Sequence, residues 1–189
     1  MTTEDLFRRI SQLLEQSGID YMLTGSFASS VYGMHRGSAD IDFIIATDET
    51  GIKRLLDLLP EKAFYSELTH ALEACRSNSM FNIIDNGTGF KVDFIFLKSR
   101  AFSREEFGRR KKAIVWGVPL YVATAEDIVL AKLEWAKLGE SSRQIEDVAG
   151  ILKVRSDALD LPYIEKWVAE LGLTSQWAHA CQFAGVQPT

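Results

Sequence analysis

Cysteine, histidine and proline are all scarce in this chain. Its 189 residues include two cysteines, three histidines and four prolines, and neither Cys75 nor Cys181 stands at a metal-type spacing. A disulfide framework and a zinc site are therefore not expected. Charged residues make up 25% of the chain and hydrophobic ones 47%, which indicates a globular protein with a sizeable core rather than a disordered one. The length fits one domain, or one core with a small added lobe.

Long apolar runs are absent too. No stretch approaches the roughly 20 apolar residues of a membrane-spanning helix, so we expect no membrane association. Residues 1–18 (MTTEDLFRRISQLLEQSG) are charged and amphipathic, and they lack the apolar region of a signal peptide. We therefore expect a reducing, cytoplasmic environment.

An excess of positive charge is also missing. The net charge is −5 and the isoelectric point is near 5.3, a balance that argues against a general nucleic-acid coat protein. The exception is a basic stretch at residues 98–112 (KSRAFSREEFGRRKK), which is more typical of a solvated helix face than of an RNA contact. Whether this stretch contacts RNA is left open by the sequence.

The spacing of apolar residues changes near residue 123. Before that point short strands alternate with helices, and after it only helical spacing remains. Helices are predicted at 3–17, 27–32, 49–59 and 103–107, and strands at 20–23, 40–46, 80–84, 90–97, 113–116 and 120–122. Further helices are predicted at 124–139, 141–153, 162–171 and 175–183, and 61–79 is compatible with a short strand plus a helix. We therefore predict an α/β (α+β) core over 1–123 and a C-terminal helical region over 124–189.

Cap and turn residues lead to three local predictions. The run Asp85-Asn86-Gly87-Thr88-Gly89 should turn a hairpin between strands 80–84 and 90–97. Ser103 should cap the helix that follows it. Residues 117–119 (Gly-Val-Pro) should form the turn of the next strand pair.

Two aspartates stand two residues apart in the predicted strand 40–46. Side chains at alternate positions of a strand point to the same face, so Asp40 and Asp42 should project side by side while Ile41 and Phe43 pack on the other face. Neighbouring carboxylates repel unless a cation neutralises them, and Mg²⁺ prefers such oxygen ligands. An isolated Asp-x-Asp often only caps a turn, but inside an apolar strand it indicates a metal site.

A third aspartate, Asp93, lies inside the apolar run FKVDFIFL. If its strand pairs with that of Asp40 and Asp42, the third carboxylate lies roughly 5 Å across the ladder. Three such carboxylates can hold two Mg²⁺ ions, or Mn²⁺ ions, at the roughly 3.5–4 Å spacing used in two-metal phosphoryl transfer. We predict these three aspartates as metal ligands and catalytic residues.

Gly25 and Ser26 follow a predicted strand and precede a predicted helix. Glycine permits a tight turn and the close approach of a ligand to the backbone. Serine can cap the helix or bond a phosphate oxygen, and the N–H groups of a helix N-terminus attract anions. Alone this would be an ordinary turn, but with the aspartates downstream it fits the terminal phosphates of a nucleoside triphosphate (NTP).

The order Gly-Ser, then Asp-Ile-Asp, then a later strand aspartate resembles the nucleotidyltransferase superfamily that includes DNA polymerase beta. The resemblance implies a nucleotidyltransferase fold, with a mixed β-sheet flanked by helices and a helical bundle after it. It also implies that Asp40 and Asp42 bind both metal ions and that Asp93 binds the catalytic ion and helps deprotonate the attacking hydroxyl. Gly25 and Ser26 would hold the triphosphate.

A narrower resemblance is to the AbiEii-type nucleotidyltransferases, toxin-like enzymes of toxin–antitoxin and phage-defence systems. Arg36 and Ser38, just before Asp40, look like that group's Arg-x-Ser/Thr-x-Asp-Ile-Asp segment, which implies a role in nucleotide binding. Lys132 looks like its helical lysine, which contacts the nucleotide. A plainer reading is that Lys132 only extends along a helix surface.

Two further residues of the helix predicted at 141–153 belong to the same resemblance. Arg143 and Asp147 look like the group's following Arg…Asp helix and would support the site, although their spacing of four residues also fits a plain helical ion pair. The resemblance covers roughly residues 19–152 in separate blocks. It departs from the group where Gly25-Ser26 stands in place of Gly-Gly, which leaves the acceptor substrate undefined.

Together these residues predict a magnesium-dependent enzyme that transfers a nucleoside monophosphate (NMP) from an NTP to a hydroxyl group and releases pyrophosphate. The acceptor is left open among tRNA or other RNA, a protein side chain, and a small molecule of the aminoglycoside antibiotic type. The rival is a non-enzymatic module that binds a nucleotide or a cognate partner protein, as an antitoxin-like subunit would. The three retained carboxylates favour the enzyme, since a degenerate copy has no need of their mutual repulsion.

Overall fold

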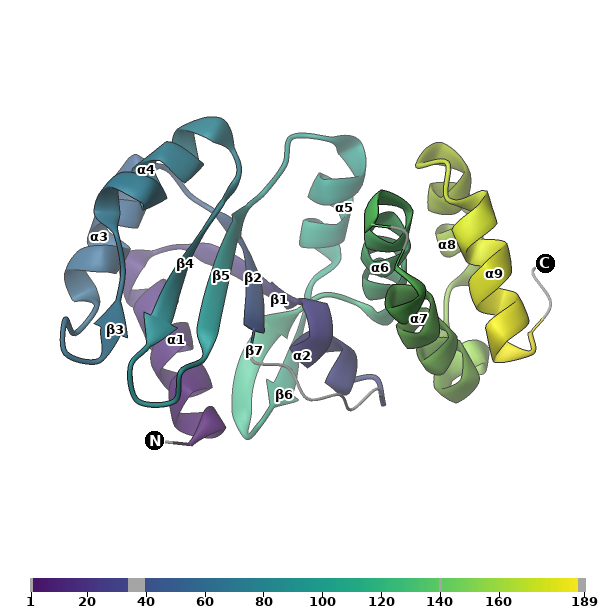
Figure 1. Cartoon of the computed structure of the whole chain (residues 1–189), viewed down its shortest axis with the longest axis horizontal. Helices are drawn as coiled ribbons and strands as arrows, with labels where there is room; N and C mark the ends of the chain where they lie inside the picture. The colour runs from purple at the N-terminus through teal and green to yellow at the C-terminus, as the bar shows by residue number, and fades with distance from the viewer. Residues whose placement is uncertain (1, 34–39, 140, 187–189) are drawn as a thin grey trace.

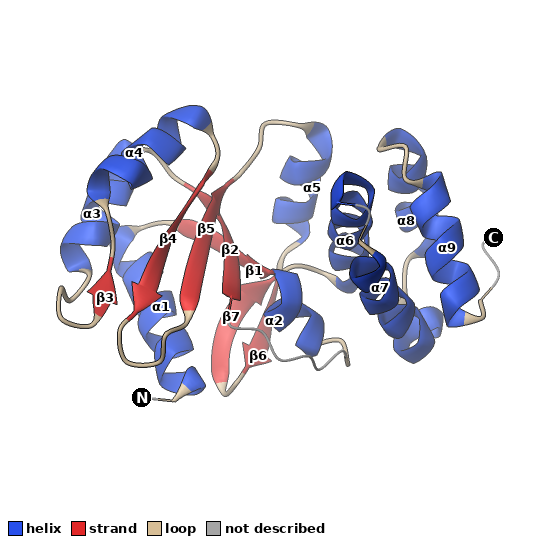
Figure 2. Cartoon of the chain, in the orientation of Figure 1, coloured by secondary structure: helices blue, strands red, loops and turns tan. Residues whose placement is uncertain are grey.

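A seven-stranded mixed sheet lies at the centre of the computed structural model, which describes residues 2–33, 40–139 and 141–186. The strands are β1 (Asp20–Thr24), β2 (Asp40–Ala46), β3 (Phe64–Tyr65), β4 (Met80–Asp85), β5 (Lys91–Phe96), β6 (Lys111–Val115) and β7 (Val118–Val122). They lie in the order β3-β4-β5-β2-β1-β7-β6 (Figure 1, Figure 2). β2 runs parallel to β5 and antiparallel to β1, so the predicted mixed sheet is confirmed.

One face of this sheet is buried under α1 (Thr3–Ser17), α3 (Glu49–Leu58) and α4 (Leu68–Ser77), which lie together at one side of the molecule (Figure 1). Large apolar side chains of the central strands fill the space beneath them. Tyr21 meets the Phe43 ring edge-on, and Phe43 stacks on Phe94. Because side chains alternate along a strand, burying Phe43 on this face places its neighbour Asp42 on the opposite one.

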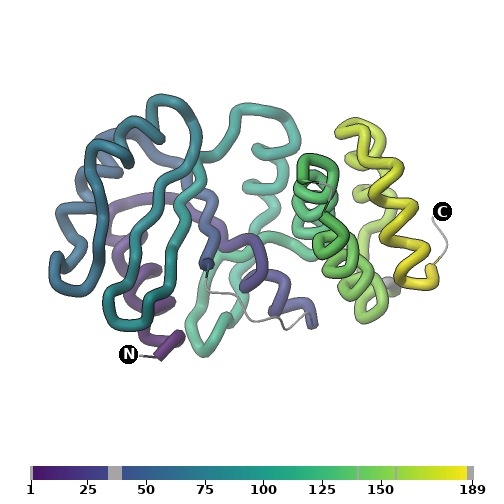
Figure 3. The backbone as a smooth tube through the Cα atoms, viewed as in Figure 1, coloured from purple at the N-terminus to yellow at the C-terminus, as the bar shows by residue number. Residues whose placement is uncertain are grey.

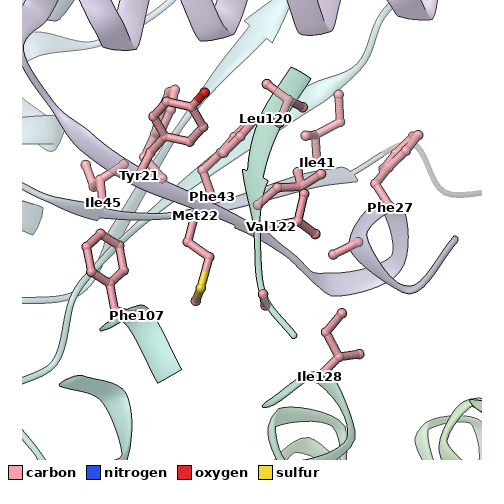
Figure 4. Close-up of a cluster of buried hydrophobic side chains, with 14 of the residues drawn as sticks. Tyr21, Met22, Phe27, Ile41, Phe43, Ile45, Phe107, Leu120, Val122 and Ile128 are labelled. Atoms are coloured by element: carbon pink, nitrogen blue, oxygen red, sulfur yellow. The ribbon is translucent and has the colours of Figure 1, made fainter. Parts of the chain in front are cut away.

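The opposite face of the sheet is turned toward α2 (Gly25–Ser30), α5 (Ala101–Arg109) and α6 (Ala125–Gly139). In Figure 4, Met22 points from β1 to the side on which Phe107 of α5 and Ile128 of α6 lie, while Tyr21 points to the other side. All four side chains are buried. The sheet therefore separates two packed layers, and the second layer is the one into which the strand aspartates project.

The chain is helical beyond residue 124, as predicted. α6 is followed by α7 (Ser142–Arg155), a 3-10 turn η1 (Ser156–Ala158), α8 (Leu161–Glu170) and α9 (Thr174–Ala184), which pack on one another at the far side of the molecule (Figure 3). Because α6 also packs against α2, the boundary between a 1–123 core and a 124–189 helical region stays a prediction. In the parts of the chain that the structure describes, none of the helices combines the length and apolar character needed to cross a bilayer.

Two local predictions are wrong. Ser103 does not cap α5: the helix begins at Ala101 and Ser103 is buried within it, where its hydroxyl accepts from Arg100 Nε. The β6–β7 turn is formed by Trp116 and Gly117, both with positive φ, rather than by 117–119, because Val115 already pairs with Val118. Pro119 is tolerated within β7 because β7 pairs with β1 at Val122, which lies at the other end of the strand.

Candidate active site

The register of β1, β2 and β5 brings Asp42 and Asp93 side by side. Asp42 pairs with Asp93 across the parallel ladder and with Thr24 across the antiparallel one. Cross-strand partners point to the same face, so both carboxylates project toward α5 and α6. The pairing of these two strands, which the sequence could only suggest, is confirmed.

Burial makes this carboxylate pair electrostatically costly. Asp93 is only 4% exposed, and its Oδ1 atom is buried without a hydrogen-bond partner. The pKa of Asp42 is raised to about 6, chiefly by burial and then by the negative charges of Asp93 and Asp40. A cation would relieve both the repulsion and the unmet hydrogen-bonding capacity.

Asp40 lies at the exposed edge of the cluster and shares a lysine with Asp93. Lys91 Nζ is 2.9 Å from Asp93 Oδ2 and 3.5 Å from Asp40 Oδ1. The hydrogen bond to Asp93 raises the pKa of Lys91, which keeps its ammonium charged. The sequence gives no reason to single out Lys91, although its place two residues before Asp93 puts it on the same face of β5.

Gly25 forms the close turn between β1 and α2 that the sequence predicts. Its φ is +67°, a left-handed conformation that side chains disfavour. A Cβ atom there would also lie 2.0 Å from Asp42 Oδ2. Glycine is therefore required at this position both by the backbone and by the space that the Asp42 carboxylate occupies.

A cavity of about 260 Å³ opens over this pair. Its walls include Gly25 and Ser26 from the β1–α2 turn, Asp42 and Asp93 from the sheet, and Lys132 from α6. Five residues predicted from separate parts of the sequence thus line one space. That space is where an NTP and metal ions would have to lie if the predicted roles hold.

Lys132 is nearly fully buried and is held by the following helix. Its Nζ lies 2.7 Å from Asp147 Oδ2 and 3.3 Å from Gln144 Oε1 of α7. Its positive charge also opposes the rise in the pKa of Asp42. Arg143, by contrast, is exposed on α7. The structure therefore brings Lys132 and Asp147 together as a buried ion pair at the cavity wall.

Arg36 and Ser38, the other two residues predicted to bind nucleotide, lie outside the described residues. Their predicted roles are therefore not addressed by the geometry.

A second cavity of about 340 Å³ adjoins the first and was not predicted. The two share Thr24, Ile95, Ala131 and Trp135 as lining residues. Glu106 of α5, which is 5% exposed, reaches the second cavity, and burial raises the pKa of its carboxyl to about 8. Nothing in the sequence around Glu106 marks it, because its burial depends on how α5 packs against α6.

Solved structures with similar folds were then compared with the chain. The solution structure of the antibiotic-resistance factor ANT(2'')-Ia matches with a TM-score of 0.58 and 14% identity, over 93% of this chain and 92% of that one. An antigenic nucleotidyltransferase-like protein from Paracoccidioides brasiliensis matches at 0.56 and 15%, over 97% and 93%. ANT(2'')-Ia in complex with adenylyl-2''-tobramycin matches at 0.57 and 15%, over 94% and 100%.

The chain has a nucleotidyltransferase fold. No protein-family model and no curated protein sequence matches it. At 14–15% identity these structures show the fold alone, and they do not single out the AbiEii-type group. The narrower resemblance therefore stays a prediction, while the fold predicted from Gly25-Ser26 and the aspartates is confirmed.

The residues present fit the divalent ions that a nucleotidyltransferase fold implies. Asp93 Oδ1 is a buried oxygen with no partner, Asp42 lies beside it, and a cation, the Lys91 ammonium, already occupies part of the cluster. Carboxylate oxygens are the ligands that Mg²⁺ prefers. Among the described residues, no three acidic, histidine or cysteine side chains yet converge as a set of metal ligands. The Lys91 ammonium lies between Asp40 and Asp93.

Proposed function

We propose that this protein is a magnesium-dependent nucleotidyltransferase that transfers an NMP from an NTP to a hydroxyl of a small molecule. The observation that carries the proposal is the in-register pair Asp42 and Asp93, buried at the floor of a cavity that Gly25, Ser26 and Lys132 also line. Within a nucleotidyltransferase fold, this arrangement places two acidic side chains, the β1–α2 turn and a basic side chain around a shared space.

The proposed reaction needs little covalent chemistry from the protein. The acceptor oxygen forms a bond to the α-phosphorus of the NTP while the bond from that phosphorus to pyrophosphate breaks, and the hydroxyl proton passes to Asp93. Asp40, Asp42 and Asp93 would hold the divalent ions, which supply neutralisation of the triphosphate and of the charge that develops during transfer. Gly25 leaves room for phosphate at the backbone, and Lys132 adds a fixed positive charge at the cavity wall.

The neighbouring cavity supports a small acceptor. It shares a wall with the first cavity, so a hydroxyl held there lies next to the site proposed for the α-phosphate. Two glutamates line it, Glu106 and Glu134, and Glu134 is held by Arg100 through contacts of 2.5 and 2.6 Å. A cavity of about 340 Å³ is in the size range of small-molecule binding sites, which favours a small hydroxyl-bearing acceptor.

The basic stretch at 98–112 is largely committed to contacts inside the molecule, which also disfavours RNA. The contacts are Arg100 with Glu134, Arg109 with Asp127 and Glu126, Arg110 with Asp20, and Lys112 over the ring of Tyr121. Contacts of this kind engage positive charges that would otherwise be available to bind a phosphate backbone. The stretch was expected to be a solvated helix face, but several of its basic side chains instead contact other parts of the molecule, which leaves fewer of them for RNA.

The test is label transfer from NTPs that carry ³²P at the α-phosphate. The protein is incubated with Mg²⁺, each NTP in turn, and three separate acceptor pools: hydroxyl-bearing small molecules including aminoglycosides, total RNA, and protein. We expect label in the small-molecule pool, and we expect Asp42→Asn to abolish it. Asp57→Asn, which removes an exposed carboxylate on α3, is the matched control and should transfer label normally.

The other outcomes are also informative. Label in RNA or protein would overturn the small acceptor and keep the enzyme. Stabilisation by an NTP and Mg²⁺ in a thermal shift assay, with no transfer to any pool, would favour the non-enzymatic binding module. Transfer that survives Asp42→Asn would remove the proposed site.

A further inference from the structure

Lys91 occupies an unusual place at the beginning of β5. It pairs in register with Asp40 of β2 and stands two residues before Asp93, so its side chain lies on the face of the sheet that carries the aspartates. Its ammonium lies 2.9 Å from Asp93 Oδ2 and 3.5 Å from Asp40 Oδ1. A single lysine therefore bridges two of the three carboxylates proposed as metal ligands.

The contacts of Asp93 are divided between its two oxygens. Oδ2 faces the Lys91 ammonium, while Oδ1 is buried without a hydrogen-bond partner. Asp40 is drawn toward the same lysine at the exposed edge of the cluster. In this arrangement Asp93 Oδ2 and Asp40 Oδ1 are both occupied by an ammonium that cannot remain there once a divalent ion takes the same oxygens.

The Lys91 side chain is able to leave. It is 38% exposed, against 6% for the side chain of Asp93, and its flexible four-carbon stem can carry the ammonium into solvent without disturbing the core. Lys132, the lysine at the cavity wall, is differently placed because it is almost fully buried and paired with Asp147 of α7. Lys91 is thus the exchangeable cation of the site, and Lys132 is a fixed one.

We propose that Lys91 is a built-in counter-cation of the metal site: its ammonium bridges Asp40 and Asp93 in the metal-free protein and is displaced when divalent ions bind. This inference rests on the proposed function, since it requires that the aspartates bind metal. The ammonium lowers the repulsion among the carboxylates when metal is absent, and it competes with metal for the same oxygens. Lys91 should therefore stabilise the metal-free fold and weaken metal binding, both through the same contacts.

The test is Mn²⁺ binding, measured by isothermal titration calorimetry at fixed ionic strength, in the wild type, Lys91→Met and Lys91→Arg. We expect Lys91→Met to bind Mn²⁺ roughly fivefold more tightly than the wild type. We expect Lys91→Arg, which keeps the cation, to bind no more tightly than the wild type. Lys62→Met is the matched control, because it removes an exposed lysine from the loop before β3 and changes the net charge equally.

Thermal unfolding and lysine labelling give readouts that do not depend on enzyme activity. In EDTA, Lys91→Met should melt below the wild type, and saturating Mn²⁺ should close or reverse that gap. In the wild-type protein, Mn²⁺ should increase the acetylation of Lys91 by acetic anhydride, followed by mass spectrometry, and leave that of Lys62 unchanged.

The possible failures are distinguishable. If the wild type binds Mn²⁺ but Lys91→Met binds no more tightly than Lys62→Met, the inference about Lys91 is overturned and the proposed function stands. Unchanged labelling of Lys91 at saturating Mn²⁺ would overturn the inference in the same way. If neither the wild type nor any variant binds Mn²⁺, with or without an NTP, the metal-dependent function itself falls.

Discussion

Asp93 and Asp127 are buried to nearly the same extent, but their surroundings are opposite. Asp127, near the start of α6, is fully buried, and its carboxylate accepts hydrogen bonds from Thr124 Oγ1 at 2.6 Å, Tyr163 Oη at 2.7 Å and Arg109 Nε at 3.3 Å. Asp93 is 4% exposed, and its polar surroundings are the half-exposed Lys91 on one oxygen, no hydrogen-bond partner on the other, and Asp42 beside it.

The difference separates a structural carboxylate from one available for chemistry. A buried charge that is fully hydrogen-bonded joins the elements that donate to it, here α5, α6 and α8 around Asp127. A buried carboxylate makes the fold less stable when one of its oxygens has no hydrogen-bond partner and a like charge lies beside it. Binding of a group from outside the chain would remove that cost. Burial alone would therefore misassign these two residues, and the hydrogen-bond partners decide between them.

The largest expected effect is on catalysis at Asp93. Asp93→Asn should lower nucleotidyl transfer by at least about a hundredfold, because it removes a charge at the point where charge develops. The free energy of unfolding of the metal-free protein should change by less than about 1 kcal/mol, since the lost Lys91 contact is offset by relief of repulsion with Asp42. Initial rates and urea unfolding check the two halves. A large loss of stability with activity retained would make Asp93 structural and erase the contrast with Asp127.

The reverse pattern is expected at Asp127. Asp127→Ala should lower the free energy of unfolding by about 3 kcal/mol, because it leaves Tyr163 and the Arg109 guanidinium without their shared buried acceptor. Urea unfolding at pH 7 measures this, with Asp57→Ala, at an exposed position of α3, as the control within about 0.5 kcal/mol of wild type. A loss below about 1 kcal/mol would show that the hydrogen-bond network around Asp127 contributes little.

Glu106 lies between the cases of Asp93 and Asp127. We expect its substitution to have the smallest effect of the three. Its pKa is raised from the usual 4.5 to about 8, chiefly by burial and then by the charge of Asp127, while Arg100 opposes the rise. Between those two values the folded protein keeps a proton that the unfolded chain releases, so stability falls as pH rises from about 4.5 to 8 and levels off above. The contribution is on the order of 2 kcal/mol between pH 5 and 8.

Glu106→Gln should remove this component, so that its unfolding free energy falls less steeply with pH than that of the wild type. The comparison is made by urea unfolding at several pH values. Glu105→Gln, at the neighbouring position on α5, pairs with Lys166 near the surface and is the matched control. Parallel pH curves for the wild type and Glu106→Gln would show that Glu106 is ionised normally and that its cavity is wetter than its burial indicates.

The parts of the site that could be predicted are those with a local signal. Asp40 and Asp42 interrupt an apolar strand, and Asp93 interrupts another, so their residue types already conflict with their positions. Gly25 stands at a strand-to-helix turn, and its φ of +67° and the space taken up by Asp42 explain why no side chain would fit. The aspartate conflicts and the strand-to-helix position of Gly25 can be seen without coordinates because each arises within a few residues of the chain, whereas the fit of Gly25 against Asp42 cannot.

The residues that were missed or only partly understood have no such local signal. Glu106 lies in an ordinary charged helix sequence, and it is buried only by the packing of α5 against the rest of the fold. The spacing of Arg143 and Asp147 fits a helical ion pair, but Asp147 forms its short pair with Lys132, fifteen residues away on another helix. A pattern of period 3.6 describes one helix and contains no information on which helix lies opposite.

The sequence by itself determined the alternation of strands and helices, the helical C-terminal region and the three acidic strand positions, because these depend on periodicity and on residue type. Only the tertiary structure decided that Asp93 stands in register with Asp42, that Lys91 bridges Asp93 to Asp40, and that a second cavity adjoins the first. The reason is physical: each of these features is a contact between segments far apart in the chain, and such contacts are set by how whole elements pack.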